Sequence, residues 1–362
     1  MRIVAGGARQ RRGKKRPTPR GRRVQKGNSV NVVETELTQP EGLLIAPEDA
    51  TGVGVLVLSG SSGRIEAERA RLLAGVGATA LSIRWFGGPG QQADTYEVPL
   101  EIFFGALDRL ASSCDRLVVV GSSFGAEAAL LTGVHDHRVD AVVAIAPTPV
   151  VWAGVAPEVA GEGVRQTSHW TLGGAALPFV PFVESWEPDS DPPAFRGLYA
   201  QSLKSHPEWV AAAEIPVERI RGDVVVIGGE DDRVWPGADF ARMVSARRAN
   251  HGLSTTLVTH PSAGHRVLFP GESPVTGGAW RKPGGRCGPR HARVAPYRQG
   301  AAPERLRTAA AGRVDATALV LFGYLFRMGC RGDRSSVVAG SRDGFYWQHS
   351  SRSHASLGVD RF

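Results

Sequence analysis

The sequence contains no long apolar run and only three cysteines. No stretch approaches the roughly 20 consecutive apolar residues of a membrane-spanning helix, and the longest candidate, Ala316–Met328, is interrupted by a glycine and an arginine. The N-terminal residues are basic where a secretory signal needs an apolar core. We therefore expect a cytoplasmic protein without a membrane span. Cys114, Cys287 and Cys330 are too few and too scattered for a disulfide framework or a CxxC metal site.

Excess positive charge is confined to the two ends of the chain. Residues 1–28 hold 11 Lys and Arg and no acids, residues 29–272 hold 17 against 30 Asp and Glu, and residues 273–362 hold 15 against 5. The net charge of +8 therefore comes from the ends, and the middle is acidic. A basic arm can contact a polyanion through charge alone, but such binding is unspecific and salt-sensitive, so we expect no specific nucleic-acid partner.

Strand-length apolar runs alternate with segments of helical spacing in the middle of the chain. Short runs without in–out alternation are typical of strands buried on both faces, and their alternation with helices predicts a parallel sheet with crossover connections. The predicted strands are 53–58, 78–83, 117–120, 141–146, 224–227 and 255–258, and the predicted helices are 65–76, 100–110, 126–131 and 238–249. We therefore predict an α/β three-layer sandwich with a mostly parallel central sheet.

Three parts of the chain differ in composition. We expect residues 1–45 to be a basic tail and lead-in that is disordered at its start, and residues 46–272 to form the α/β domain. Residues 273–362 are rich in Arg, Gly, Ala and Ser; we expect a low-complexity segment that is natural and disordered or the product of a shifted reading frame. Within the domain, residues 150–221 hold four of the eight tryptophans without clear strand signals, which indicates an inserted cap.

The motif Gly121-Ser122-Ser123-Phe124-Gly125 lies between a predicted β-branched strand and an alanine-rich helix. A G-x-S-x-G pattern is weak alone, but this setting is the one that a nucleophile elbow requires. The elbow would expose the Ser123 hydroxyl at the N-terminus of the helix, where developing negative charge is favoured. Ser123 is therefore the candidate nucleophile.

A serine hydroxyl is a poor nucleophile at neutral pH, so it needs a base and a group that orients the base. The turn after the predicted strand 224–227 supplies two neighbouring acids. Asp232 lies three residues after Gly229 and four before Pro236, a spacing that recurs in hydrolases, and Asp231 is the alternative. Both follow a strand at the sheet edge where open α/β sheets hold their active-site loops.

The candidate base is His265, which follows a small-residue loop after the last predicted strand. The competing histidine, His260, ends that strand and precedes Pro261, a more structural position. Ser123, Asp232 and His265 follow one another in the chain order of α/β-hydrolase triads.

Two loops are candidates for an oxyanion hole. The amide of the residue after the nucleophile, Phe124, should combine with an amide from the loop that follows an earlier strand. Gly60-Ser61-Ser62-Gly63 is that loop, and the sequence does not choose between Ser61 and Ser62 as the donor.

Several stretches together resemble the C-terminal catalytic domain shared by acyl-CoA thioester hydrolases and bile acid-CoA:amino acid N-acyltransferases. They lie within roughly residues 53–270, a span of about three fifths of the chain, and are Gly60–Gly63, Leu81–Gly87, Val98–Phe103, Gly121–Gly125, Ala146–Trp152, the Asp231-Asp232 turn and Gly264-His265. The resemblance implies an α/β-hydrolase fold and an acyl-enzyme on Ser123. It also implies hydrolysis rather than conjugation, because the amidating branch uses cysteine as its nucleophile.

The sequence departs from this family in three places. Phe124 stands where the family usually has lysine, about 50 residues precede the first predicted strand where longer relatives carry a β-sandwich, and residues 273–362 lack a convincing counterpart of the terminal helix. We expect a cofactor-independent enzyme that cleaves a small-molecule acyl-CoA thioester. A carboxylesterase or dienelactone-hydrolase-like esterase, a non-catalytic α/β-hydrolase scaffold and a nucleic-acid-associated protein acting through the arms remain as alternatives, and the oligomeric state is open.

Overall fold

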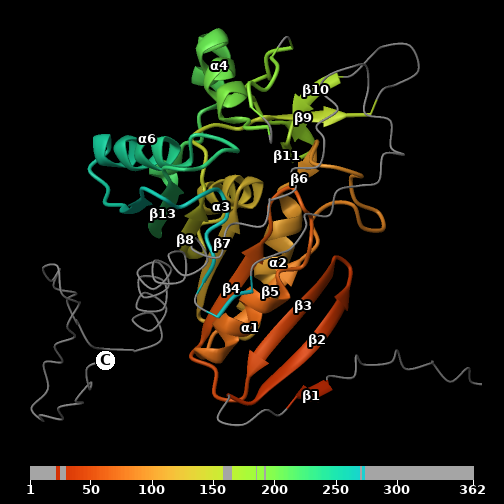
Figure 1. The fold of residues 1–362 in the computed structure, drawn as a ribbon. Helices are drawn as coiled ribbons and strands as arrows, with labels where there is room; N and C mark the ends of the chain where they lie inside the picture. Colours follow the sequence, from red (N-terminus) through yellow and green to blue (C-terminus); the bar gives the residue numbers. More distant parts are fainter. Residues whose placement is uncertain are drawn as a thin grey trace, which may run out of the picture.

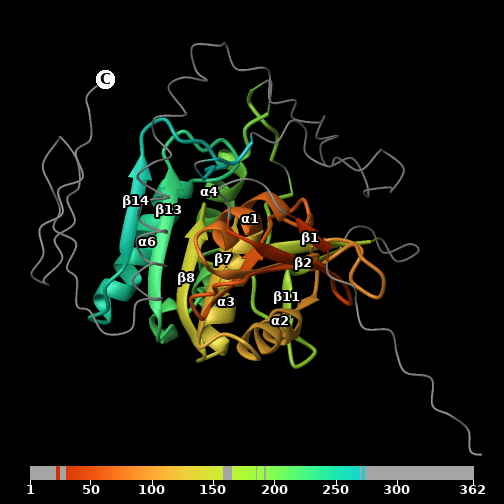
Figure 2. The same cartoon turned by 90° about the horizontal axis from the view of Figure 1, so that it is seen from below.

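The computed structural model describes residues 22–24, 30–157, 165–184, 186–190, 193–269 and 271–273. Cys287, Cys330 and all but the first residue of the predicted segment 273–362 lie outside this set. A nine-stranded sheet forms the centre, in the order β1-β2-β3-β5-β4-β7-β8-β13-β14. Figure 2 shows β14 at one edge of this sheet and β1 and β2 at the other. No helix in the described part of the chain is both long and apolar enough to cross a bilayer.

Six neighbouring strands of the sheet run parallel to one another. They are β5 (Thr79–Ile83), β4 (Val53–Leu58), β7 (Arg116–Ser122), β8 (Val139–Ile145), β13 (Asp223–Gly229) and β14 (Thr256–His260). All residues of β4 and β5 are buried, as expected for strands covered on both faces. The predicted parallel sheet is therefore confirmed, with strand boundaries that match or shift by at most two residues.

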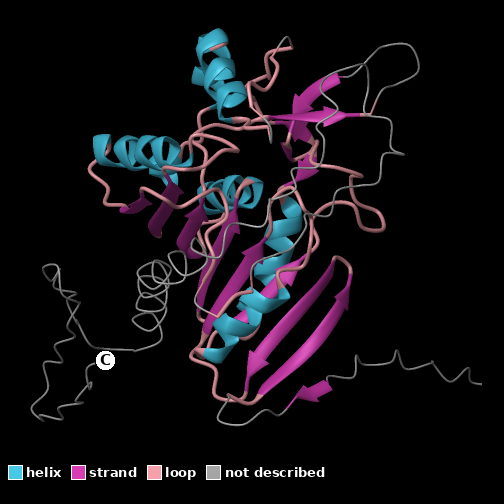
Figure 3. Cartoon of the chain, viewed as in Figure 1, coloured by secondary structure: helices cyan, strands magenta, loops and turns pink. Residues whose placement is uncertain are grey.

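Helices cover both faces of the sheet (Figure 1, Figure 3). On one face, α1 (Ala67–Gly75) packs against β3, β5 and β4, and its Ala70, Leu73 and Ala74 belong to one apolar cluster with alternate residues of β4, β7 and β8. On the other, α2 (Glu101–Ala111), α3 (Phe124–His135) and α6 (Gly237–Asn250) pack against the remaining alternate residues. Because the sheet separates two apolar clusters, the molecule is the predicted α/β three-layer sandwich.

The ordered fold begins earlier than the sequence indicates. β2 (Val32–Thr38) and β3 (Glu41–Pro47) form an antiparallel hairpin that joins the sheet through β5, and β1 (Arg22–Val24) pairs with β2. The expectation that residues 30–45 are only a lead-in is therefore wrong. The apolar signal is weak there because every residue of β2 is at least partly exposed.

The described residues of the segment 150–221 lie outside the central sheet and include short strands that the sequence did not signal. It contains β9 (Ala153–Ala156), β10 (Arg165–Ser168), β11 (Trp170–Leu172), β12 (Ala175–Ala176), α4 (Arg196–Ser205), α5 (Pro207–Ala213) and the 3-10 helix η1 (Val217–Arg219). β10 pairs with β9, whereas β11 pairs with β12 and with β6 (Val98–Pro99). Strands of two to four residues are too short to give a clear periodic signal.

Candidate active site

Ser123 occupies the sharp turn between β7 and α3. Its backbone angles are φ 60° and ψ −126°, a conformation that costs a non-glycine residue free energy and that is found mainly at functional sites. The turn is held because the Ser123 amide donates to the Ile145 carbonyl at 2.9 Å and the Ser123 carbonyl accepts from the Ala126 amide at 2.8 Å. Ser123, which is half-buried, thus lies at the N-terminus of α3.

Glycine is required on both sides of this turn. A β-carbon on Gly121 would lie 1.8 Å from the Gly125 carbonyl oxygen, and one on Gly125 would lie 2.3 Å from the Ser59 carbonyl oxygen. Neither distance is compatible with any side chain. The two glycines of the motif therefore let α3 approach β4 and β7 closely enough to form the elbow.

The loop after β4 lies directly beside Ser123. A β-carbon on Gly60 would lie 2.8 Å from the β-carbon of Ser123. The Gly63 amide donates to the Gly60 carbonyl at 3.1 Å and closes a turn with Ser61 and Ser62 at its centre. Neither serine amide has a hydrogen-bond partner among the described residues, so both are free to donate. The amide of Phe124 belongs to the first turn of α3, whose N–H groups have no acceptor within the helix.

Asp232 and His265 are brought together by two neighbouring strands. Nδ1 of His265 lies 2.8 Å from Oδ2 of Asp232. The other carboxylate oxygen accepts from the amides of Val234 at 2.8 Å and Trp235 at 3.2 Å, and Asp232 is 2% exposed. The Asp231 side chain is exposed, and only its amide is bonded, to the Ala263 carbonyl. Asp232 and not Asp231 therefore orients the His265 ring.

His260, the competing histidine, lies at the end of β14 in a different environment. Its Nδ1 accepts from the Ser262 amide at 3.2 Å within a surface turn. Ser123 and His265 themselves are not joined by a direct hydrogen bond within the described structure. Catalytic hydrogen bonds are often long or poorly aligned in unliganded sites and tighten only in the substrate complex.

A continuous row of aromatic rings runs from the nucleophile turn to His265. The Phe124 ring lies edge-on to that of Trp235 with centroids 5.6 Å apart, and Trp235 lies edge-on to His265 at 5.1 Å. At its other end Phe124 contacts the His169 ring at 4.2 Å. Phe124 thus packs between the rings of Trp235 and His169.

A second carboxylate and histidine, Glu127 and His169, lie next to these aromatic rings. Sequence analysis did not identify them. Oε1 of the fully buried Glu127 accepts from the Trp152 amide at 3.1 Å and from Nε1 of Trp170 at 2.8 Å. Its Oε2 lies 3.5 Å from Nδ1 of His169. Through these two hydrogen bonds Glu127 fastens the inserted segment to α3, the helix that follows the nucleophile turn. Burial, together with the negative charges of Glu127 and Asp232, raises the pKa of the nearby Tyr199 hydroxyl.

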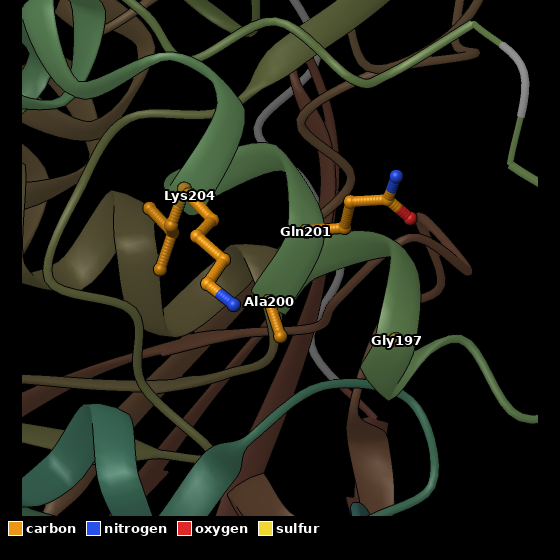
Figure 4. Close-up of a pocket in the computed structure, with 5 residues that line it drawn as sticks. Gly197, Ala200, Gln201 and Lys204 are labelled. Carbon is orange, nitrogen blue, oxygen red and sulfur yellow. The ribbon is translucent and has the colours of Figure 1, made fainter.

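One surface hollow is separate from these residues. It has a volume of about 600 Å³ and lies along α4, lined by Gly197, Ala200, Gln201, Leu203 and Lys204. Figure 4 shows Gln201 pointing away from Lys204, so the two polar side chains do not converge on one point. This hollow contains none of the candidate catalytic residues.

The chain matches the family described as "BAAT / Acyl-CoA thioester hydrolase C terminal" over residues 99–283, just over half of its length. It belongs to this family. The match includes Ser123, Asp232 and His265, and it confirms the resemblance inferred from the motifs. Among curated proteins the chain is similar to mouse acyl-coenzyme A amino acid N-acyltransferase 2, at 28% identity over 73% of this chain and 61% of that protein's length.

Human acyl-coenzyme A thioesterase 6 is 25% identical over 62% of this chain and 51% of its own length. The chain thus spans about half to three fifths of these relatives. Among solved structures it is similar to Pyrococcus horikoshii acylaminoacyl peptidase, at 12% identity and a TM-score of 0.42 over 68% of this chain and 37% of that one. An acetyl xylan esterase from Paenibacillus is 17% identical with a TM-score of 0.39, over 70% of this chain and 85% of that one.

Proposed function

We propose that this protein is a serine hydrolase that cleaves acyl-CoA thioesters to a free acid and CoA through an acyl-enzyme on Ser123. The observation that carries the proposal is the serine in the strained turn at the N-terminus of α3, between two loops with free amides. Membership of a family that contains a thioesterase supports acyl transfer as the reaction class. Serine at the nucleophile position favours hydrolysis over conjugation.

The first half of the reaction forms the acyl-enzyme. Nε2 of His265 accepts the hydroxyl proton of Ser123 as Oγ attacks the thioester carbonyl carbon. The resulting imidazolium is stabilised by Asp232, which holds the other ring nitrogen at 2.8 Å. The C–S bond then breaks, and the thiolate leaves with the proton that His265 carried.

The second half returns the enzyme to its starting state. A water molecule gives a proton to His265 and attacks the acyl carbon. The bond between that carbon and Oγ of Ser123 then breaks, Oγ takes the proton back from His265, and the carboxylic acid is released. In both halves the carbonyl oxygen becomes an oxyanion. The amides of Phe124 and of Ser61 or Ser62 are the proposed donors to it, and one such donor is worth about 3 to 4 kcal/mol.

An ester substrate is the second candidate, because a triad does not distinguish sulfur from oxygen as the leaving atom. Phe124 favours this candidate, because it contacts Trp235 and His169 and offers no positive charge to a CoA phosphate. A carboxylesterase or dienelactone-hydrolase-like enzyme would use the same residues.

The test is the release of free CoA from short- to long-chain acyl-CoAs by the wild type and Ser123→Ala, with matching p-nitrophenyl esters and with glycine added as an acceptor in a parallel series. Turnover that is faster on thioesters and lost in Ser123→Ala supports the proposal. Turnover of esters alone assigns a carboxylesterase, and an acyl-glycine product assigns conjugation. No turnover of any substrate favours a non-catalytic scaffold.

A further inference from the structure

A buried arginine connects the nucleophile turn to the loop that carries His265. Arg69 lies on α1, and its side chain is 3% exposed. Its Nη1 donates to Oγ of Ser122 at 2.9 Å, and its Nη2 donates to the Val267 carbonyl at 3.1 Å. Nε and Nη2 also donate to the two carboxylate oxygens of Glu272, at 2.6 and 2.8 Å.

These contacts reach both sides of the proposed catalytic centre. Ser122 immediately precedes Ser123, and Val267 follows His265 by two residues. Because Ser123 and His265 do not bond directly, their spacing depends on what holds the two backbones. The guanidinium of Arg69 is one group that is bonded to both.

Two residues further along the chain after His265, Phe269 and Glu272, also contact Arg69. Oε2 of Glu272 accepts from the Phe269 amide at 2.8 Å, and the Phe269 ring lies 4.3 Å from the guanidinium carbon of Arg69. The planar guanidinium spreads five donors over three nitrogens in a rigid fork, whereas the three donors of a lysine ammonium leave from one nitrogen, so lysine does not reproduce this set of contacts. The buried positive charge is balanced by Glu272, whose side chain is likewise 3% exposed.

A second arginine on the same helix provides a comparison within the molecule. Arg71 donates to both carboxylate oxygens of Glu34 at 2.6 and 2.9 Å, so its pairing resembles that of Arg69. Its side chain, however, is 52% exposed and contacts the β2–β3 hairpin instead of the catalytic loops. A solvent-exposed pair of this kind contributes little. Both arginines therefore lie on α1 and pair with a glutamate, but only Arg69 is also bonded to the nucleophile turn and the His265 loop.

We propose that Arg69 is a positioning residue, which sets the distance between the Ser123 turn and the His265 loop so that the proton can pass from Oγ to Nε2. This inference rests on the proposed function. Arg69 acts through Ser122 and Val267 and does not touch the reacting atoms. Its loss is expected to slow the chemical step without weakening substrate binding.

The experiment compares Arg69→Lys, Ser122→Ala and the control Arg71→Lys in the full chain. Ser122→Ala removes only the hydroxyl that accepts from Arg69 and leaves the pair with Glu272 in place. For each variant, kcat and KM are measured on the best substrate, with the melting temperature as a measure of folding. The rate at which a fluorophosphonate modifies Ser123 is measured in parallel; in that reaction Oγ displaces fluoride from phosphorus and His265 takes the hydroxyl proton.

Arg69→Lys is expected to lower both kcat and the labelling rate about 10- to 100-fold with KM within twofold, because a displacement of about 1 Å can cost that much. Ser122→Ala should change the same quantities in the same direction by a smaller factor, and Arg71→Lys should leave both rates within twofold of the wild type. A folded Arg69→Lys with wild-type rates would overturn the proposal. So would an effect confined to KM.

If Arg69→Lys does not fold, Ser122→Ala decides: wild-type kcat and labelling in that variant contradict the positioning role. Failure of the proposed function has a different signature. In that case the wild type itself is neither labelled at Ser123 nor active, and the positioning role is overturned with it. Normal labelling of the wild type together with unchanged variants overturns the positioning role alone.

Discussion

Oδ2 of Asp232 lies 2.8 Å from Nδ1 of His265, while Oδ1 of the same carboxylate is held by the amides of Val234 and Trp235. The aspartate is therefore fixed by the backbone of its own turn, and it fixes the histidine in turn. A carboxylate in this position sets the ring orientation and selects the tautomer with its proton on Nδ1. Nε2 is then free to accept the proton of Ser123.

Asp232→Asn should retain the fold and lose most of the activity. An amide that donates to Nδ1 would leave the ring in the wrong tautomer, and we expect kcat to fall on the order of 10³- to 10⁴-fold. The neighbouring variant Asp231→Asn is the control, because that side chain is exposed and does not contact His265. Steady-state kinetics of the two variants make the comparison. A larger loss in Asp231→Asn would assign the orienting role to the other acid.

Gly125→Ala should destabilise the protein strongly, whereas Gly105→Ala should stabilise it. The new β-carbon at Gly125 would lie 2.3 Å from a backbone oxygen, and overpacking of this severity costs on the order of 3 kcal/mol. Gly105 lies inside α2 with open space around it, where alanine is better than glycine by about 0.5 to 1 kcal/mol. Urea unfolding of both variants measures the difference, and equal stabilities would contradict the described geometry of the nucleophile turn.

The elbow, Asp232 and His265 were predictable because each is marked by a pattern of a few consecutive residues after a strand. Arg69 and Glu272, by contrast, are 203 positions apart, and neither carries a local signature. Glu127 looks like an ordinary acid in the first turn of a helix, and only the tertiary structure brings it to His169. Contacts of this kind depend on which faces of distant elements meet, which hydrophobic periodicity does not specify.

The choice between Asp231 and Asp232 shows the same limit at shorter range. Spacing from Gly229 and Pro236 favours Asp232, but adjacent residues in a turn point in different directions, and only the backbone conformation decides which one faces His265. Their catalytic roles, and that of Ser123, remain predictions. The parallel sheet and the family membership were both predictable, because the buried strands and the motifs extend over most of the domain.

The free energy of unfolding should fall in acid when Glu218 is protonated. The pKa of this carboxyl is lowered to about 2, chiefly by its hydrogen bonds with Arg247. A group with a depressed pKa stabilises the fold while it is ionised, so its contribution is complete above its ordinary pKa near 4.5 and disappears as the pH falls toward 2. Glu218→Gln should therefore be less stable than the wild type at neutral pH, by about 1 kcal/mol for a pair near the surface.

The measurement is urea unfolding of both proteins at a series of pH values, with Glu208→Gln, on the exposed side of α5, as the control. The difference between the wild type and Glu218→Gln should shrink as the pH is lowered through the acid range. A difference that stays constant or grows in acid would show that the ion pair does not act as described.

The central claim is that Ser123 carries the acyl group, and mass spectrometry of protein quenched during turnover tests it most directly. The account predicts an added mass equal to the acyl group on the peptide that contains Ser123, which increases with the acyl chain supplied and is absent in Ser123→Ala together with turnover. Continued turnover by Ser123→Ala, without an adduct on the wild-type peptide, would contradict it.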